Sequence, residues 1–160
     1  MTSAAHPPGK AGEFDFLSGH WRIAHRRLLA GTLDQWDAFA GEASCWSILN
    51  GTVSVEELRI PARNFSGMGL RVLDQDQQVW SDFWVNGAHG IVQAPGVQGY
   101  FEHGQGIFAS HEIQDGQATV VRGLWDNISA TACRWQQAIS RDGGTTWLTN
   151  WSMDWVRVGS

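Results

Sequence analysis

Apolar and polar residues alternate along most of the chain after Phe14, with the period of two that is typical of a β-strand with one buried face. The segment near the C-terminus shows the pattern most clearly. One face carries mostly large apolar side chains, namely Trp147, Thr149, Trp151, Met153 and Trp155. The opposite face carries Leu148, Asn150, Ser152, Asp154 and Val156. We therefore expect the tryptophan face to lie inside the protein, and Asn150, Ser152 and Asp154 to meet water or a second subunit.

Turn signals divide the remaining chain into short segments of the same kind. Asp115-Gly116 and Asp142-Gly143-Gly144 place residues that tolerate positive φ between alternating runs, as primed hairpin turns require. The expected strands cover residues 20–29, 36–47, 52–60, 71–74, 79–86, 106–113, 118–125, 132–140 and 145–158. Eight to ten strands that each pair with a sequence neighbour usually close into a barrel, because closure removes exposed edges. The predicted fold is an all-β, closed antiparallel up-and-down β-barrel.

Three segments fall outside this pattern. Residues 1–12 are rich in Pro and Gly and are expected to form a flexible lead-in to a single barrel domain over residues 13–160. A short helical stretch at 12–18 would let Phe14 and Leu17 plug one end of the barrel. Residues 87–100 are rich in Gly and contain a proline, which predicts a long loop at the barrel mouth, where binding residues usually lie.

The balance of acidic and basic residues indicates which kinds of molecule the protein can bind. The chain has 11 basic and 16 acidic residues and a formal net charge of −5, which argues against a nucleic-acid surface. No apolar run approaches the roughly 20 residues of a membrane helix, and the N-terminus lacks the apolar core of a secretory signal. Cys45 and Cys133 form no CxxC pair and are expected to be reduced, packed thiols. We expect a soluble cytoplasmic protein without membrane or nucleic-acid partners.

Tryptophan is the compositional anomaly, with 10 in 160 residues. An indole gives a large, stiff contact surface for a flat ligand and can also face a cation. A barrel of about eight strands has room inside for one small ligand. The tryptophans that lie in mid-strand and are candidates to line such a pocket are Trp80, Trp84, Trp125, Trp135 and Trp151.

Polar groups within the expected strands supply candidate chemistry. Asp82 shares a face with Trp80 and Trp84, but either face of residues 79–86 could be internal. If this face is inside, loss of hydration would raise the pKa of Asp82 and suit it to act as a general base. Arg122 stands among apolar residues and is its expected partner, either fixed inside against a carboxylate or ligand, or pointing outward. Arg71 carries the same ambiguity.

The six histidines do not form a metal motif, because the chain contains no HxH, HxxxH or HExxH spacing. We therefore expect no metal and no cofactor. His89, in the predicted loop, is the best single histidine for acid–base work or ligand contact, since its charge is adjustable near neutral pH.

The stretch Phe14-Asp15-Phe16-Leu17-Ser18-Gly19-His20-Trp21 resembles the Gly-x-Trp entry of the calycin superfamily, which includes lipocalins and fatty-acid-binding proteins. In that superfamily the tryptophan closes one end of the barrel and is often covered by an arginine of the last strand. The resemblance assigns these parts to Trp21 and Arg157. It also implies an internal ligand cavity.

Two further resemblances concern the C-terminal half. Arg134-Trp135-Gln136-Gln137-Ala138, with Asp142-Gly143-Gly144-Thr145-Thr146-Trp147 and Asn150-Trp151, is similar to a small bacterial calycin-like family without an assigned function; the likeness spans residues 14–158. Related barrels, the nitrobindins, bind haem through a histidine near the C-terminal strands. This chain has no histidine after His111, which leaves His89 or His103 as alternative haem ligands.

Two functional hypotheses follow. The first is binding of a small hydrophobic or aromatic molecule by the tryptophans, with Arg122, Arg71 or Asp82 as a polar anchor. The alternative is a cofactor-free isomerase, cyclase or lyase that uses Asp82 or His89 as base and Arg122 to stabilise negative charge. A homodimer through exposed strands is compatible with both.

Overall fold

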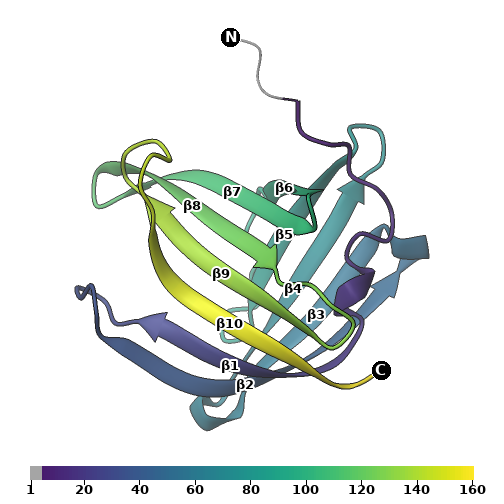
Figure 1. Ribbon diagram of the computed structural model, residues 1–160, viewed down its shortest axis with the longest axis horizontal. Helices are drawn as coiled ribbons and strands as arrows, with labels where there is room; N and C mark the ends of the chain where they lie inside the picture. The colour runs from purple at the N-terminus through teal and green to yellow at the C-terminus, as the bar shows by residue number, and fades with distance from the viewer. Residues whose placement is uncertain (1–4) are drawn as a thin grey trace.

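Each strand of the protein pairs with the next strand along the chain, and the last pairs with the first. The computed structural model describes residues 5–160, and there ten antiparallel strands form one closed barrel (Figure 1). The predicted fold class is confirmed. The strands are β1 (Gly19–Leu28), β2 (Trp36–Ile48), β3 (Val53–Ile60), β4 (Phe65–Asp74), β5 (Val79–Asn86), β6 (Val97–Glu102), β7 (Gln105–Gln114), β8 (Gln117–Asp126), β9 (Ala132–Ser140) and β10 (Leu148–Gly159).

β10 begins at Leu148 rather than at residue 145, and two larger differences from the prediction involve glycine. β4 begins at Phe65 rather than near residue 71, because the glycines that interrupt its apolar pattern are accommodated within the strand. A Cβ at Gly67 would lie 2.3 Å from the Trp84 ring, so this glycine makes room for an indole inside the barrel. β6 takes up the end of the predicted 87–100 loop, where Gly99 leaves space for Phe108 in the same way.

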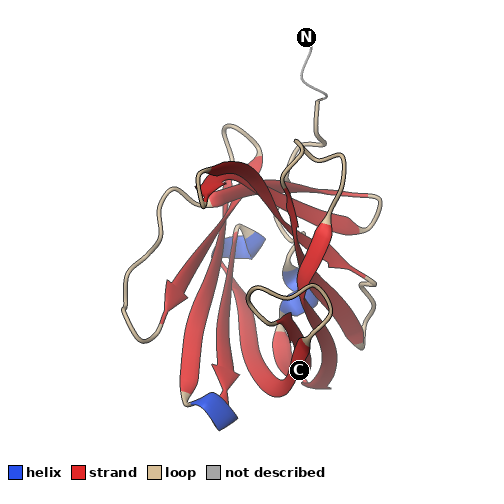
Figure 2. Cartoon of the chain, turned by 90° about the vertical axis from the view of Figure 1, so that its left-hand side faces the viewer, coloured by secondary structure: helices blue, strands red, loops and turns tan. Residues whose placement is uncertain are grey.

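One end of the barrel is closed by the segment before β1. The expected helical stretch is a single 3-10 turn, η1 (Asp15–Leu17), and it places Phe14 and Leu17 in the buried core. The Phe14 ring meets Trp80 and Phe101 edge-on, with 4.9 Å between ring centroids in each pair. We call this the plug end. Figure 2 shows how little of the structure is helical beside the strands.

The arginine that the calycin resemblance assigns to the last strand covers the tryptophan of the first. The Arg157 guanidinium carbon lies 4.2 Å from the centroid of the Trp21 ring, and the guanidinium donates to the carbonyl oxygens of Phe16 and Ser18. Trp21 in turn donates its indole N–H to the carbonyl of Leu17 at 2.7 Å. These contacts fasten η1 across the barrel end.

The segment before η1 runs along the outside of the barrel. The Gly9 amide donates to the Gln78 carbonyl at 2.7 Å, and the His6 ring stacks on Tyr100 with 3.8 Å between centroids. Residues 1–4 of the predicted lead-in lie outside the described residues. The flexibility of the lead-in stays a prediction.

A β-bulge in β10 changes which side chains point inward before and after it. Trp151 pairs with Gln137 and Thr149 with Ala138, so the strand pairing shifts between them at Asn150. Trp151, Met153 and Trp155 point inward, as the alternation predicts. Thr149 and Trp147 fall on the other side of the bulge and face outward, which corrects the prediction for these two residues.

Asn150 also departs from its predicted position, because the bulge turns its amide oxygen toward the inner face. There it accepts a hydrogen bond from the Gln137 side-chain amide at 3.1 Å. Asp154 is exposed on the outer face, as expected.

Both cysteines are buried and free, which confirms the prediction of packed thiols. Burial raises the pKa of the Cys133 thiol to about 12, and burial together with Glu56 raises the pKa of Cys45. Within residues 5–160, none of the helical turns has the length and apolar character that a bilayer crossing would require.

Candidate functional site

A cavity of about 850 Å³ occupies the barrel interior above the plug. It extends from Trp125 and Trp155, which cover the plug, to the loops 61–64 and 87–96 at the opposite end. We call that opposite end the rim. Strand pairing explains the shape, because the side chains that line the cavity occupy alternate positions on consecutive strands.

Indole rings form the largest aromatic group in the wall. Those that line the cavity are Trp84, Trp125, Trp135, Trp151 and Trp155. Trp125 and Trp155 meet edge-on with 5.4 Å between centroids, and so do Trp135 and Trp151 at 5.9 Å. The first four belong to the predicted set, and Trp155 is an addition that its place on the inward face of β10 could have supplied.

One of the predicted tryptophans, Trp80, does not line the cavity. Trp80 is fully buried in the plug below the cavity, where its indole N–H lies 3.1 Å from a carboxylate oxygen of Glu13. It packs against Phe14, so it holds the plug in place.

The Trp80–Asp82–Trp84 face of β5 is the inner one. In the pairing with β4, Asp82 lies opposite Arg71 and Trp84 opposite Gly69. Both Arg71 and Asp82 line the cavity, which answers the question that the sequence left open. Arg71 is 4% exposed, so it is one of the inward arginines rather than an outward one.

A chain of three charged groups crosses the cavity floor. Arg71 donates from Nη2 to Glu56 Oε1 at 2.7 Å, and its Nε lies 3.6 Å from Asp82 Oδ1. Glu56 is itself 4% exposed and was absent from the sequence prediction. Its signal was available, because Glu56 shares the inward alternation of Leu58 and Ile60 on β3.

Electrostatics distinguish the three groups. Burial lowers the pKa of Arg71, but Glu56 and Asp82 outweigh burial and the net pKa is raised, so the guanidinium stays charged. Burial raises the pKa of Asp82 to about 6, partly offset by Arg71 and increased by Glu56. Asp82 thus titrates closer to neutral pH than an ordinary carboxyl group, and 26% of its side chain is exposed.

A buried histidine supports the wall and was also missed by the sequence prediction. Trp151 donates its indole N–H to His25 Nδ1 at 3.1 Å, and the His25 ring stacks on Phe39 at 4.6 Å. Burial, and then the charge of Arg63, lowers the pKa of His25 to about 4. The neutral ring therefore fixes the orientation of Trp151 at neutral pH. The inward position of His25 was predictable from the sequence, because His25 falls on the same face of β1 as Trp21.

Most charged side chains at the rim already contact another side chain of the protein. Arg63 forms an ion pair with Asp37 and lies over the Phe39 ring, 3.9 Å from its centroid. The Arg27 guanidinium covers the Trp151 ring at 4.6 Å. Glu112 contributes a carboxylate to the same part of the lining.

Two residues predicted for the site lie away from the cavity. Arg122 pairs with Ala109 and Ala138 on the outer face of the barrel, and its guanidinium lies 4.0 Å from the centroid of Trp147. Its apolar neighbours in the sequence left both an inward and an outward position open, and in the structure Trp147 of the loop after β9 covers it from outside. His89 is exposed in the loop after β5 and does not line the cavity. The two do not meet Asp82.

The histidine positions bear on metal and haem ligation. No group of three or more His, Cys, Asp or Glu side chains within residues 5–160 is arranged to hold a metal ion. His103, the other candidate haem ligand, lies in the tight turn between β6 and β7 with its side chain 89% exposed. That turn belongs to the plug end, away from the cavity.

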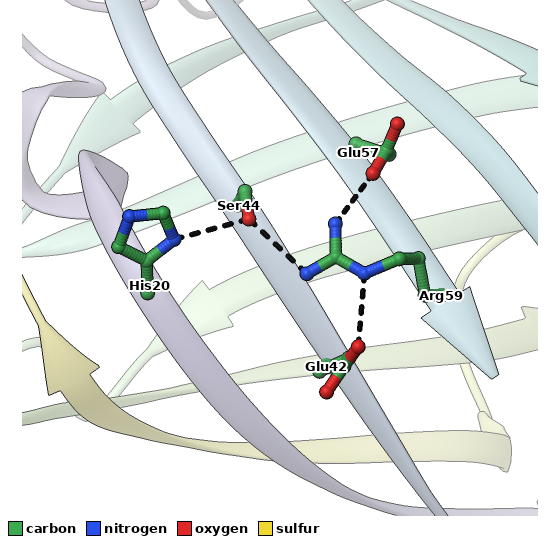
Figure 3. Close-up of polar contacts among 5 residues, drawn as sticks. All are labelled: His20, Glu42, Ser44, Glu57 and Arg59. Atoms are coloured by element: carbon green, nitrogen blue, oxygen red, sulfur yellow. Dashed lines mark hydrogen bonds and ion pairs between the residues drawn. The ribbon is translucent and has the colours of Figure 1, made fainter. Parts of the chain in front are cut away.

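A second polar cluster lies on the outer face of β1, β2 and β3 (Figure 3). Ser44 Oγ lies 3.1 Å from both His20 Nδ1 and Arg59 Nη2, and Arg59 also pairs with Glu42 and Glu57. The hydrogen bond with Glu42 is the first cause that raises the pKa of Arg59. Exposed cross-strand pairs of this kind contribute modestly to sheet stability, and we assign this cluster to strand pairing rather than to chemistry.

Comparisons with known proteins add a likeness of fold. No family model matches the chain, and no curated protein matches it. Among solved structures, a protein of unknown function from the DUF3598 family of Nostoc punctiforme matches with a TM-score of 0.51 and 13% identity. The match covers 98% of this chain and 52% of that protein, so this chain spans about half its length. At this identity the likeness concerns the fold alone.

Proposed function

We propose that the protein binds a small hydrophobic or aromatic molecule inside the barrel. The observation that carries the proposal is the cavity of about 850 Å³ walled by five indole rings. Sites for small molecules usually measure about 300–1,000 Å³ and combine apolar walls with a few polar groups. The calycin resemblance supports the same conclusion, because barrels of that superfamily hold ligands in their interior.

The indole walls favour a flat ligand. Trp135 and Trp151 meet edge to face and are only partly buried, so part of their ring surface is available for stacking. The His25 hydrogen bond holds Trp151 in position, so part of the wall is ordered before the ligand arrives. Such preorganisation lowers the entropic cost of binding.

Replacing Trp84 by alanine should weaken binding of a flat, uncharged aromatic probe such as naphthalene about tenfold. The reason is the loss of one wall of contact area, worth on the order of 1–2 kcal/mol. Quenching of tryptophan fluorescence and thermal shift across a panel of aromatic and fatty compounds measure this loss.

Trp46→Ala is the matched control, because Trp46 is 47% exposed on the outer side of β2. This variant should bind the same probe as the wild type does. Equal affinity for the wild type and Trp84→Ala, or no binding by any compound, would contradict the proposal.

The raised pKa of Asp82, about 6, favours a second candidate function, a cofactor-free reaction of the isomerase, cyclase or lyase type. Neither Arg122 nor His89 lines the cavity. In this proposal Arg71 therefore replaces Arg122 as the cation that is paired with Asp82. Its basis is the partly exposed Asp82 carboxylate on the cavity floor, which can accept a proton from an acidic C–H group.

If Asp82 is a general base, the protein should accelerate exchange of the C1 hydrogens of 2-tetralone with D₂O by at least 10²-fold at pH 7.5. Asp82→Asn should abolish the acceleration, because the amide cannot take up the proton. Deuterium incorporation is followed by proton NMR. Exchange at the buffer rate in the wild-type protein would remove this candidate and leave ligand binding unaffected.

A further inference from the structure

The three charged groups on the cavity floor do not balance, because two carboxylates face a single guanidinium. Glu56 and Arg71 form one close ion pair, and Asp82 is the third member of the chain. Its Oδ1 is 3.6 Å from Arg71 Nε, which is an ion-pair distance but too long for a good hydrogen bond. Two carboxylates thus share one guanidinium, and the floor carries one surplus negative charge.

No other charged residue of the cavity supplies the missing positive charge. Arg63 is paired with Asp37, and Arg27 lies over Trp151 at the rim. Within residues 5–160, Arg71 is the one cation that forms an ion pair with Asp82. The opposite strand neighbour of Asp82 on β6 is Val97, which is apolar.

From this arrangement we propose, resting on the function proposed above, that the ligand is an organic monocation: a protonated amine attached to a flat apolar body. Its ammonium group binds Asp82. The floor then carries negative and positive charges in alternation: Glu56, Arg71, Asp82 and the ligand. The apolar body lies between the indole rings toward the rim.

The indole walls suit a cation as well as an apolar group. Two cations of the protein already lie over these rings: Arg27 over Trp151 at 4.6 Å and Arg71 over Trp125 at 5.5 Å. The negative face of an indole attracts an ammonium group, and the attraction grows where water is displaced. An amine at the floor therefore meets a carboxylate and electron-rich rings together.

An anionic ligand does not fit the same floor. Arg71 Nε and Nη1 have no hydrogen-bond partner, but both atoms are enclosed by protein atoms and do not open onto the cavity. The group that is open is the Asp82 carboxylate, 26% exposed. A carboxylate placed there would meet the like charges of Asp82 and Glu56.

The test compares three probes of nearly equal size on the wild-type protein at pH 7.5: 2-naphthylmethylamine, 2-naphthylmethanol and 2-naphthoate. We expect the amine to bind at least tenfold more tightly than the alcohol, and the naphthoate to bind most weakly. Asp82→Asn should lower the affinity for the amine at least tenfold while it changes the affinity for the alcohol less than twofold. Isothermal titration calorimetry measures all of these values.

Asp154→Asn is the matched control, because Asp154 is exposed on the outer face of β10 and the change removes the same charge. It should leave the affinity for all three probes unchanged.

Lowering the pH from 7.5 to 5 should weaken amine binding to the wild type, since Asp82 takes up a proton near pH 6. The charged groups that face Asp82 are Arg71 on β4 and Glu56 on β3; Arg27, Arg63, His111 and Glu112 line the cavity beyond them.

The outcomes separate this inference from the function on which it rests. If amine and alcohol bind equally, or if naphthoate binds most tightly, the cationic ligand is wrong and binding of a flat molecule stands. If none of the three probes binds, both are overturned. An amine preference that survives in Asp82→Asn would also overturn the assignment of its partner.

Discussion

Replacing Arg71 by methionine should lower the free energy of unfolding by about 3–5 kcal/mol, because the change leaves a buried carboxylate without its partner. Glu56 and Arg71 are each 4% exposed and are joined at 2.7 Å, so little water can replace the lost guanidinium. Methionine keeps much of the volume of the arginine stem and adapts to irregular space, which limits the cavity that the change creates. Urea unfolding followed by tryptophan fluorescence measures the loss.

The double variant Glu56→Gln with Arg71→Met separates charge from packing. It removes both charges of the close pair and leaves only the partly exposed Asp82 without a cation, so we expect it to recover more than half of the lost stability. If the double variant is as unstable as Arg71→Met, the ion pair with Glu56 contributes little, and the loss comes from the packing of the arginine stem or from its ion pair with Asp82. The comparison also shows whether Arg71 can be changed without loss of the fold in later binding studies.

Most of the strands, their order and most of the inner wall were predictable from the sequence, because period-two alternation is a local property of the chain; β6 was the exception. Trp125, Trp135 and Trp151 each lie where that pattern places them. Neighbouring strands joined by short turns gave the pairing, and closure followed from the need to remove exposed edges.

The errors arise where the position of a residue depends on its partners across the sheet. Residues 79–86 carry aromatic side chains on both faces, so alternation by itself could not assign an inner face. The bulge at Asn150 depends on the pairing with β9, which has no local signal strong enough to predict it. Arg122 has apolar neighbours in the sequence, and its outward position depends on Trp147, 25 positions away in a loop.

One charged group of the floor, Glu56, was missed for a different physical reason. Glu56 is followed by Glu57, and a pair of adjacent acidic residues in a strand resembles an exposed edge. The first is fully buried and the second exposed, because a strand directs consecutive side chains to opposite sides. Burial of Glu56 is tolerable because Arg71 lies on the neighbouring strand, which the sequence could not show before the pairing of β3 with β4 was known.

Phe14→Ala is expected to lower the free energy of unfolding by about 3–5 kcal/mol, because it empties the centre of the plug. Phe14 is 1% exposed and touches the rings of Trp80, Phe101 and Phe108, which come from three different strands. The Arg71 guanidinium carbon also lies 5.5 Å from the centroid of the Phe14 ring, so the plug supports the cavity floor from below.

Ile113→Ala provides the comparison for this change, since Ile113 is 74% exposed and its truncation should alter stability by less than about 0.5 kcal/mol. Because the plug supports the floor, Phe14→Ala should also weaken ligand binding under conditions in which the variant remains folded. A variant that loses stability but keeps full affinity would show that the strands alone position Arg71 and Asp82. One that loses neither would show that the barrel is closed without the plug.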